Sequence, residues 1–150
     1  METSLPINGG CACGKISFQC NALPALMFQC HCRDCQRATG GLYAPNVWFY
    51  VEDIEIRGEL QSYTVDSDAG NVVDHDFCGE CGSPIGNRTS DHPEMRGFRA
   101  ATFNDMDWLR PAANIYMRNS PSWEYTNPDL PAVDGQPSEE FISGVIDQGS

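Results

Sequence analysis

The cysteines are the residues whose type and spacing most clearly indicate chemistry in this sequence. Seven of the eight fall into short-spaced groups. We call Cys11, Cys13, Cys78 and Cys81 the four-cysteine cluster and Cys30, Cys32 and Cys35 the cysteine triplet. Thiolates two or three positions apart in a tight turn can share one ion, and zinc takes four ligands in a tetrahedron. The eighth, Cys20, ends an alternating stretch and is expected to be a small buried hydrophobic residue.

The two groups predict metal sites of different kinds. The four-cysteine cluster supplies four sulfurs and joins the beginning of the chain to its middle, as a structural zinc does. The triplet supplies three, and three protein ligands with a further position for water or substrate are typical of catalytic zinc. The alternative is a second closed site, with His75 or His92 as the fourth ligand. We therefore expect two zinc ions per chain, with the triplet as the catalytic group.

Length and composition predict a small acidic protein. The chain has 150 residues, about one domain, and 41% of them are hydrophobic, enough for a modest core. Its net charge of −12 argues against nucleic acid or an anionic membrane as a partner. The first residues lack a signal-peptide pattern, and the longest apolar run, residues 47–51, is too short to span a bilayer. We expect a cytoplasmic protein, whose thiols stay reduced and favour metal over disulfides.

The elements that must position these cysteines are mostly strands. Short β-branched and aromatic segments, separated by glycine- and proline-rich turns, predict an all-β fold. The expected strands cover residues 15–20, 46–51, 54–56, 60–65, 72–77, 98–103 and 114–118. One short helix is expected at residues 33–39, before two glycines. We assign residues 1–125 to the zinc-binding domain and 126–150 to an acidic, proline-containing tail, with a short ordered piece at 139–146.

Three motifs resemble the glutathione-dependent formaldehyde-activating enzyme family, which includes centromere protein V-like domains. They are GGCACG at residues 9–14, CHCRDCQRATG at 30–40 and FCGECG at 77–82. Residues 101–107 and 115–123 look like later blocks of the family, so the resemblance covers about 5–125. It implies a mostly antiparallel β-tent fold, a structural zinc on the four-cysteine cluster and a second zinc on the triplet. It also implies a carbon–sulfur lyase that adds glutathione to formaldehyde, giving S-hydroxymethylglutathione.

A thiol substrate suits a zinc site made of sulfur. Sulfur ligands reduce the Lewis acidity of the ion, so the site is better suited to a further thiolate than to hydroxide. Because glutathione is an anion, local cations must offset the negative charge of the protein. Arg33 and Arg37 flank the triplet and are the candidates, with Lys15 a weaker third; ordinary surface cations are the alternative. His31 is a candidate proton shuttle or a structural hydrogen-bond partner of a ligand sulfur.

Two further functions compete with an enzyme acting on thiol adducts of small aldehydes. The first is a zinc-stapled binding module of the same fold without catalysis. The second is a metal or redox responder, since exposed zinc thiolates are oxidisable. A small thiol such as glutathione is the expected partner of the enzyme.

Overall fold

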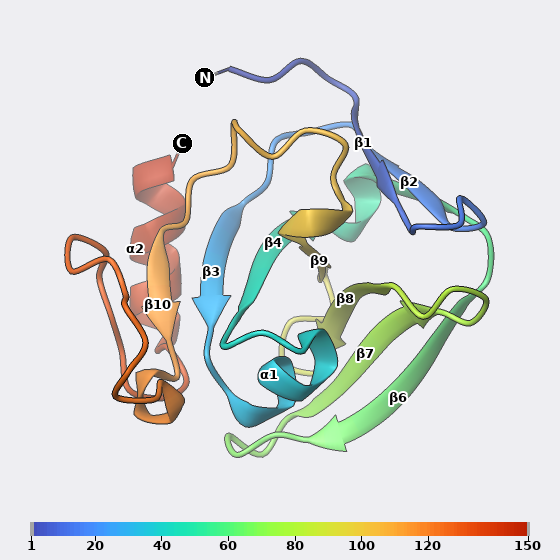
Figure 1. Cartoon of the computed structure of the whole chain (residues 1–150). Coiled ribbons are helices and arrows are strands. Elements are labelled where there is room, and N and C mark those ends of the chain that lie inside the picture. The colour runs from blue at the N-terminus through green and yellow to red at the C-terminus, as the bar shows by residue number, and fades with distance from the viewer. Residues whose placement is uncertain (1, 150) are drawn as a thin grey trace.

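Two β-sheets form the framework of the protein in the computed structural model, which describes residues 2–149 (Figure 1). The smaller sheet has the order β1 (Ile7–Gly10), β2 (Ser17–Cys20) and β5 (Ile54–Arg57). The larger one has the order β10 (Ala113–Ile115), β3 (Leu26–Cys30), β4 (Ala44–Tyr50), β9 (Met95–Arg99), β8 (Pro84–Thr89), β7 (Val72–Cys78) and β6 (Leu60–Asp66). All neighbouring strands are antiparallel except β10 and β3. The predicted mainly-β class is confirmed.

The predicted helix is present as α1 (Arg33–Thr39), with the expected bounds. Cys32 caps its N-terminus, because the Cys32 Sγ accepts a hydrogen bond from the Cys35 amide at 3.3 Å. Gly40 ends the helix with φ of 75°, a conformation that glycine adopts without strain. Two members of the cysteine triplet therefore lie in the first turn of α1 or at its cap.

Two of the expected strands end several residues earlier in the structure. The strand expected at 98–103 lies at Met95–Arg99, and Ala100–Thr102 is a 3₁₀ turn, η2, closed by a 2.6 Å bond from the Thr102 hydroxyl to the Arg99 carbonyl. The strand expected at 114–118 ends at Ile115, because Tyr116 takes a positive φ of 56° before the 3₁₀ turn η3 (Met117–Asn119). A third 3₁₀ turn, η1, covers Val51–Asp53. The sequence analysis missed β1, β3 and β8.

An aromatic cluster fills the space between the two sheets. Phe18 of β2 stacks on Phe98 of β9 with ring centroids 3.9 Å apart, and Phe103 meets Phe18 edge-on at 5.3 Å. Cys20 is completely buried in this cluster, as expected. Cys78 belongs to the same cluster. The core therefore fixes the end of β7, where the second half of the four-cysteine cluster begins.

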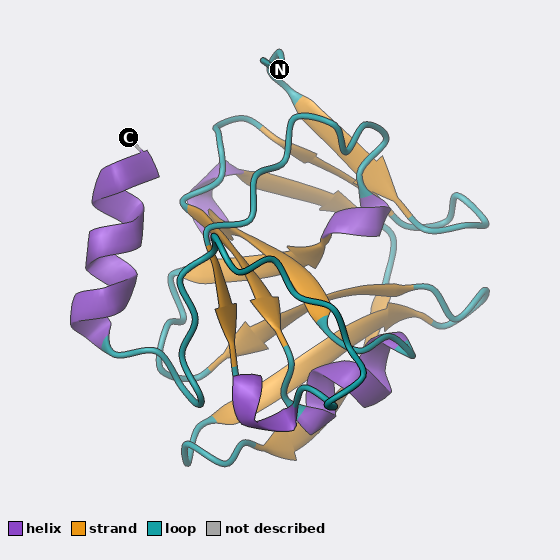
Figure 2. Ribbon diagram, turned by 60° about the vertical axis from the view of Figure 1, so that its left-hand side comes forward, coloured by secondary structure: helices purple, strands orange, loops and turns teal. Residues whose placement is uncertain are grey.

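The C-terminal segment packs against the edge of the large sheet. Val133 donates a backbone hydrogen bond to Asn114 of β10 at 3.0 Å. The helix α2 (Glu139–Gly149) then lies beside β10 (Figure 1) and ends at the C-terminus marked in Figure 2. Phe141 of α2 packs near Phe28 of β3. The ordered piece expected at 139–146 thus falls within α2. No helix in residues 2–149 combines the length and apolarity needed to cross a membrane.

The attachment of α2 is expected to weaken as pH rises. His92 contacts the carboxylates of Glu94 and Glu139 at 3.0 Å each. Partial burial lowers the pKa of His92, but these two hydrogen bonds outweigh it, and the pKa is raised. The stabilisation is thus full below the unfolded pKa of about 6.5 and is lost as pH passes the folded pKa.

Hydrogen exchange of the α2 amides, corrected for intrinsic rate, measures this effect between pH 6 and pH 8. We expect faster corrected exchange at pH 8. The opening free energy of α2 should change by less than about 1 kcal/mol, because the three side chains are partly exposed. A His92→Gln variant should lose the pH dependence. Equal pH dependence in the variant and the wild type would contradict the prediction.

Candidate metal centres and the adjoining cavity

The four-cysteine cluster forms where two distant turns meet. Cys11 and Cys13 follow β1, whereas Cys78 ends β7 and Cys81 lies in the next turn. All four sulfurs lie within 4.8 Å of one another, with Cys11–Cys13 at 3.6 Å and Cys13–Cys78 at 3.8 Å. Tetrahedral zinc with Zn–S distances of about 2.3 Å places its sulfurs about 3.8 Å apart. No disulfide forms among these cysteines, so this donor set fits a tetrahedral thiolate-binding ion.

Hydrogen bonds orient the cluster and favour the thiolate form of Cys11 and Cys81. The Ile16 amide donates to Cys11 Sγ at 3.3 Å, and the Ser83 hydroxyl lies 3.1 Å from Cys81 Sγ. Ser83 itself accepts from the Ala12 amide, so it links the two turns. The hydrogen bonds from Ser83 lower the pKa of Cys81 to about 5. A charged sulfur is thus favoured at one corner even before an ion supplies positive charge.

The cysteine triplet is local and largely buried. Cys30 ends β3, Cys32 caps α1 and Cys35 lies in its first turn, and their sulfurs lie within 4.8 Å of one another. Hydrogen bonds from the Cys30 and Cys32 thiols hold the pKa of Cys35 well below its ordinary value. Among the described residues, no fourth histidine, cysteine or carboxylate joins this group. Three cysteine sulfurs converge here, and as thiolates they can hold an ion with a further position for another ligand.

A cavity of about 390 Å³ adjoins the triplet. All three cysteines line it, together with Arg33, Arg37, Trp48, His75, Asn87 and Tyr116. The volume lies in the range of pockets that enclose small molecules. A larger hollow of about 550 Å³, lined by Val51, Arg88 and Arg96 among others, contains no cysteine or histidine. The smaller cavity is therefore where chemistry at the triplet would take place.

Comparison with protein families identifies the chain. Residues 6–119 match the family described as glutathione-dependent formaldehyde-activating enzyme. The chain belongs to this family. A crystal structure of a Rhodobacter sphaeroides protein, a Northeast Structural Genomics target, is similar at 22% identity and a TM-score of 0.51, covering 84% of this chain and 99% of that chain. This likeness supports the fold alone. No match is found among curated proteins.

Only some of the residues predicted from the sequence to bind substrate line this cavity. Arg33 and Arg37 line it, and Arg33 Nη1 donates to Gln36 Oε1 at 2.5 Å. His31 is completely buried and does not line the cavity; its ring nitrogens contact the Gln29 carbonyl and Glu124. These contacts direct the His31 ring away from the cavity that Cys30 and Cys32 line.

The sequence analysis missed a polar group beneath the triplet, which consists of the buried residues Arg99, Asn46 and His75. Arg99 donates to the Asn46 side-chain oxygen through Nη1 and to His75 Nδ1 through Nη2, the latter at 3.0 Å. The Asn46 amide in turn lies 3.8 Å from Cys35 Sγ. Only 3% of Arg99 is exposed, and none of the ion pairs in residues 2–149 involves it. The guanidinium favours the thiolate form of Cys35 and lowers its pKa.

Removing the Arg99 charge should weaken metal binding at the triplet. Arg99→Gln retains a polar side chain but removes the positive charge that offsets the thiolates. We expect the affinity of the triplet for zinc to fall about 10- to 100-fold, as for other groups that support metal ligands. Competition with a chelator of known affinity measures the change.

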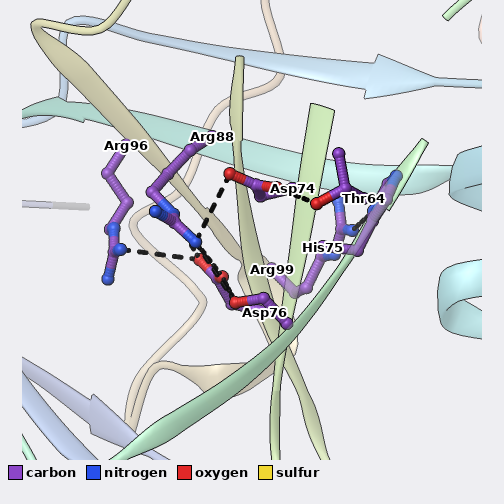
Figure 3. A network of polar contacts seen from close by, with 8 residues as sticks. Thr64, Asp74, His75, Asp76, Arg88, Arg96 and Arg99 are labelled. Atoms are coloured by element: carbon purple, nitrogen blue, oxygen red, sulfur yellow. Dashed lines mark hydrogen bonds and ion pairs between the residues drawn. The ribbon is translucent and has the colours of Figure 1, made fainter. Parts of the chain in front are cut away.

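Arg88→Gln is the matched control. Arg88 lies on β8 in the same sheet, but its guanidinium contacts the carboxylate of Asp76 at 2.8 Å (Figure 3), and Arg88 does not line the cavity beside the triplet. Figure 3 also shows Arg96 directed at Asp76, apart from the contact between His75 and Arg99. Zinc affinity should not change in this variant. Equal affinities in the Arg99→Gln variant and the wild type would contradict the prediction.

Proposed function

We propose that this protein is a zinc-dependent carbon–sulfur lyase acting on thiol adducts of small aldehydes, with glutathione and formaldehyde as the type substrates. The observation that supports the proposal is the triplet itself: three clustered cysteines, without a fourth protein ligand among residues 2–149, on the wall of a small-molecule cavity. Family membership supports the same reaction class. The four-cysteine cluster would hold a separate, structural zinc.

The sulfur donors of the triplet fit a zinc ion, which Cys30, Cys32 and Cys35 would hold. Such an ion, when bound, lowers the pKa of a thiol and stabilises its thiolate at neutral pH. Arg99 would offset part of the negative charge of the protein sulfurs from beneath. A reduced cytoplasmic setting would keep both clusters free of disulfides.

The chain has cations where an anionic thiol needs them. The net charge of −12 opposes glutathione, which is itself an anion. Arg33 and Arg37 line the cavity beside the triplet and would bind its carboxylates. Trp48 and Tyr116 supply larger side chains to the cavity wall. The cavity thus offers charged contacts for the ends of the substrate and a sulfur-lined wall for its thiol.

The reaction is a reversible addition. The substrate thiol gives its proton to water, and the resulting thiolate sulfur forms a bond to the carbonyl carbon of the aldehyde while the π-electron pair moves to the carbonyl oxygen. That oxygen takes a proton from water and becomes the hydroxyl of the adduct. In reverse, the hydroxyl loses its proton to water, its oxygen re-forms the carbonyl π bond, and the C–S bond breaks with its electron pair going to sulfur, which then takes up a proton. No oxidant or reductant is needed.

Exchange spectroscopy tests the proposal directly. Glutathione and ¹³C-formaldehyde are mixed at equilibrium with the zinc-loaded protein, and two-dimensional NMR measures the rate at which free and adduct forms interconvert. We expect the wild-type protein to raise this rate above the spontaneous rate in proportion to its concentration. Exchange at the spontaneous rate, by protein holding two zinc ions, would exclude the enzyme and leave the zinc-stapled binding module.

A further inference from the structure

His75 presents an unused polar atom beside the triplet. It lies in the middle of β7, lines the cavity and is 97% buried, with 3% of its surface exposed. Its Nδ1 contacts Arg99 at 3.0 Å, whereas its buried Nε2 has no hydrogen-bond partner. Tyr63 stacks against the ring at a centroid distance of 5.2 Å, which holds the ring in place. Buried polar atoms are rarely left without partners, so Nε2 needs an explanation.

The contact with Arg99 fixes which nitrogen carries the hydrogen. A guanidinium has only hydrogen-bond donors, so Nδ1 of His75 must accept (Figure 3). A neutral imidazole that accepts at Nδ1 carries its hydrogen on Nε2. Burial lowers the pKa of His75, which keeps the ring neutral. In this state Nε2 has no lone pair for a metal ion, so the contact argues against His75 as a fourth ligand.

Asn87 adds the complementary group. It is paired with His75 across the β7–β8 ladder, and it lines the same cavity. It is 5% exposed, and its buried Oδ1 has no partner either. The two strands thus place a hydrogen-bond donor and a hydrogen-bond acceptor near each other. A hydroxyl group both donates and accepts, so this pair matches a ligand hydroxyl.

We propose that His75 and Asn87 bind the oxygen atom of the thiol–aldehyde adduct, with His75 Nε2–H as donor and Asn87 Oδ1 as acceptor. This inference rests on the proposed function and deepens it. While the C–S bond forms, the carbonyl electron pair moves to oxygen, and the N–H of His75 stabilises the resulting charge. After that oxygen takes its proton from water, the new hydroxyl donates to Asn87. The ligand class is therefore a hydroxyalkyl thioether with its hydroxyl on the carbon next to sulfur.

The tautomer of His75 provides a test that needs no catalysis. Long-range ¹H–¹⁵N correlation spectra of zinc-loaded, ¹⁵N-labelled wild-type protein report the state of each ring nitrogen, and nuclear Overhauser contacts with the stacked ring of Tyr63 identify the His75 signals. We expect the hydrogen on Nε2 and an unprotonated, uncoordinated Nδ1. A hydrogen on Nδ1, or either nitrogen bound to zinc, would overturn the inference. The measurement uses the unsubstituted protein, so it stands even if a variant at this position does not fold.

Two substitutions test the role in the reaction. His75→Phe removes the donor, whereas His75→Gln keeps an acceptor for Arg99 and an amide N–H for the ligand. At equal zinc content, we expect thiol–aldehyde exchange to slow about 100-fold in the phenylalanine variant and to stay within about tenfold of the wild type in the glutamine variant. Glutathione affinity, measured by calorimetry, should be unchanged in both variants, because glutathione itself lacks the hydroxyl oxygen that the adduct gains from the aldehyde.

The outcomes separate this inference from the proposed function. Wild-type exchange in the phenylalanine variant would overturn the role of His75 and leave the lyase proposal standing. A folded glutamine variant as slow as the phenylalanine variant would do the same. Exchange in the wild type no faster than the spontaneous rate would overturn the lyase proposal and, with it, the assignment of the bound oxygen.

Discussion

A variant with Cys30→Ser, Cys32→Ser and Cys35→Ser is expected to keep its fold and one zinc ion per chain while thiol–aldehyde exchange falls to its spontaneous rate. The triplet lies within a single stretch of chain from the end of β3 to the first turn of α1. Its ion would therefore close no long loop. Its removal adds little entropy to the unfolded chain and so costs little stability. The aromatic cluster between the sheets and the four-cysteine cluster both remain. Metal analysis of native protein, circular dichroism and exchange NMR measure the three quantities.

Cys20→Ala is the matched control for this variant. It also removes a buried thiol, but Cys20 lies in the aromatic cluster and belongs to neither metal group. Its unfolding free energy should fall by about 1 kcal/mol through lost packing, while its zinc content and exchange rate stay at wild-type values. Two zinc ions in the triple serine variant would show that the triplet is not a metal site. One ion with full exchange activity would remove the triplet from catalysis.

Local chemistry made the metal ligands predictable. Cysteines two or three positions apart are neighbours in any tight turn, so the three groups could be recognised without knowing the fold. Dividing them into four and three required only the coordination number of zinc. The structure brings both predicted groups together. The helix at 33–39 was predictable for a similar reason, since its C-terminal stop lies in the adjacent sequence.

The polar group beneath the triplet depends on strand pairing and was not predictable in the same way. Arg99, His75 and Asn46 come from β9, β7 and β4, and only the order and register of the large sheet place them together. The misplaced strand at 98–103 hid the position of Arg99 at the end of β9. His31 shows the converse. It is next to two predicted ligands in sequence, yet its ring contacts Glu124 and does not line the cavity. Proximity in sequence therefore located the sulfurs but not the groups that act on them.

The four-cysteine cluster should determine whether the protein folds, and Cys81→Ser tests this with little effect on packing. Cys81 is exposed, so replacing its sulfur with oxygen removes a metal ligand and almost no buried surface. The ion would join residues 11–13 to residues 78–81, and metal binding at such a site is folding free energy. We expect the variant to lose one zinc ion and at least about 3 kcal/mol of unfolding free energy.

Glu80→Gln, at an exposed neighbouring position with a 3.5 Å ion pair to Lys15, should keep both its zinc content and, within about 0.5 kcal/mol, its stability. A chelator should destabilise the wild type by a similar amount and the Cys81→Ser variant by much less, because the variant has already lost the ion that stabilises the fold. Denaturant unfolding with and without chelator measures the stability change in each variant and the effect of the chelator on the wild type and on the Cys81→Ser variant. Wild-type stability in the Cys81→Ser variant would mean that the two sheets hold together without this ion, and the four sulfurs would then have no structural role.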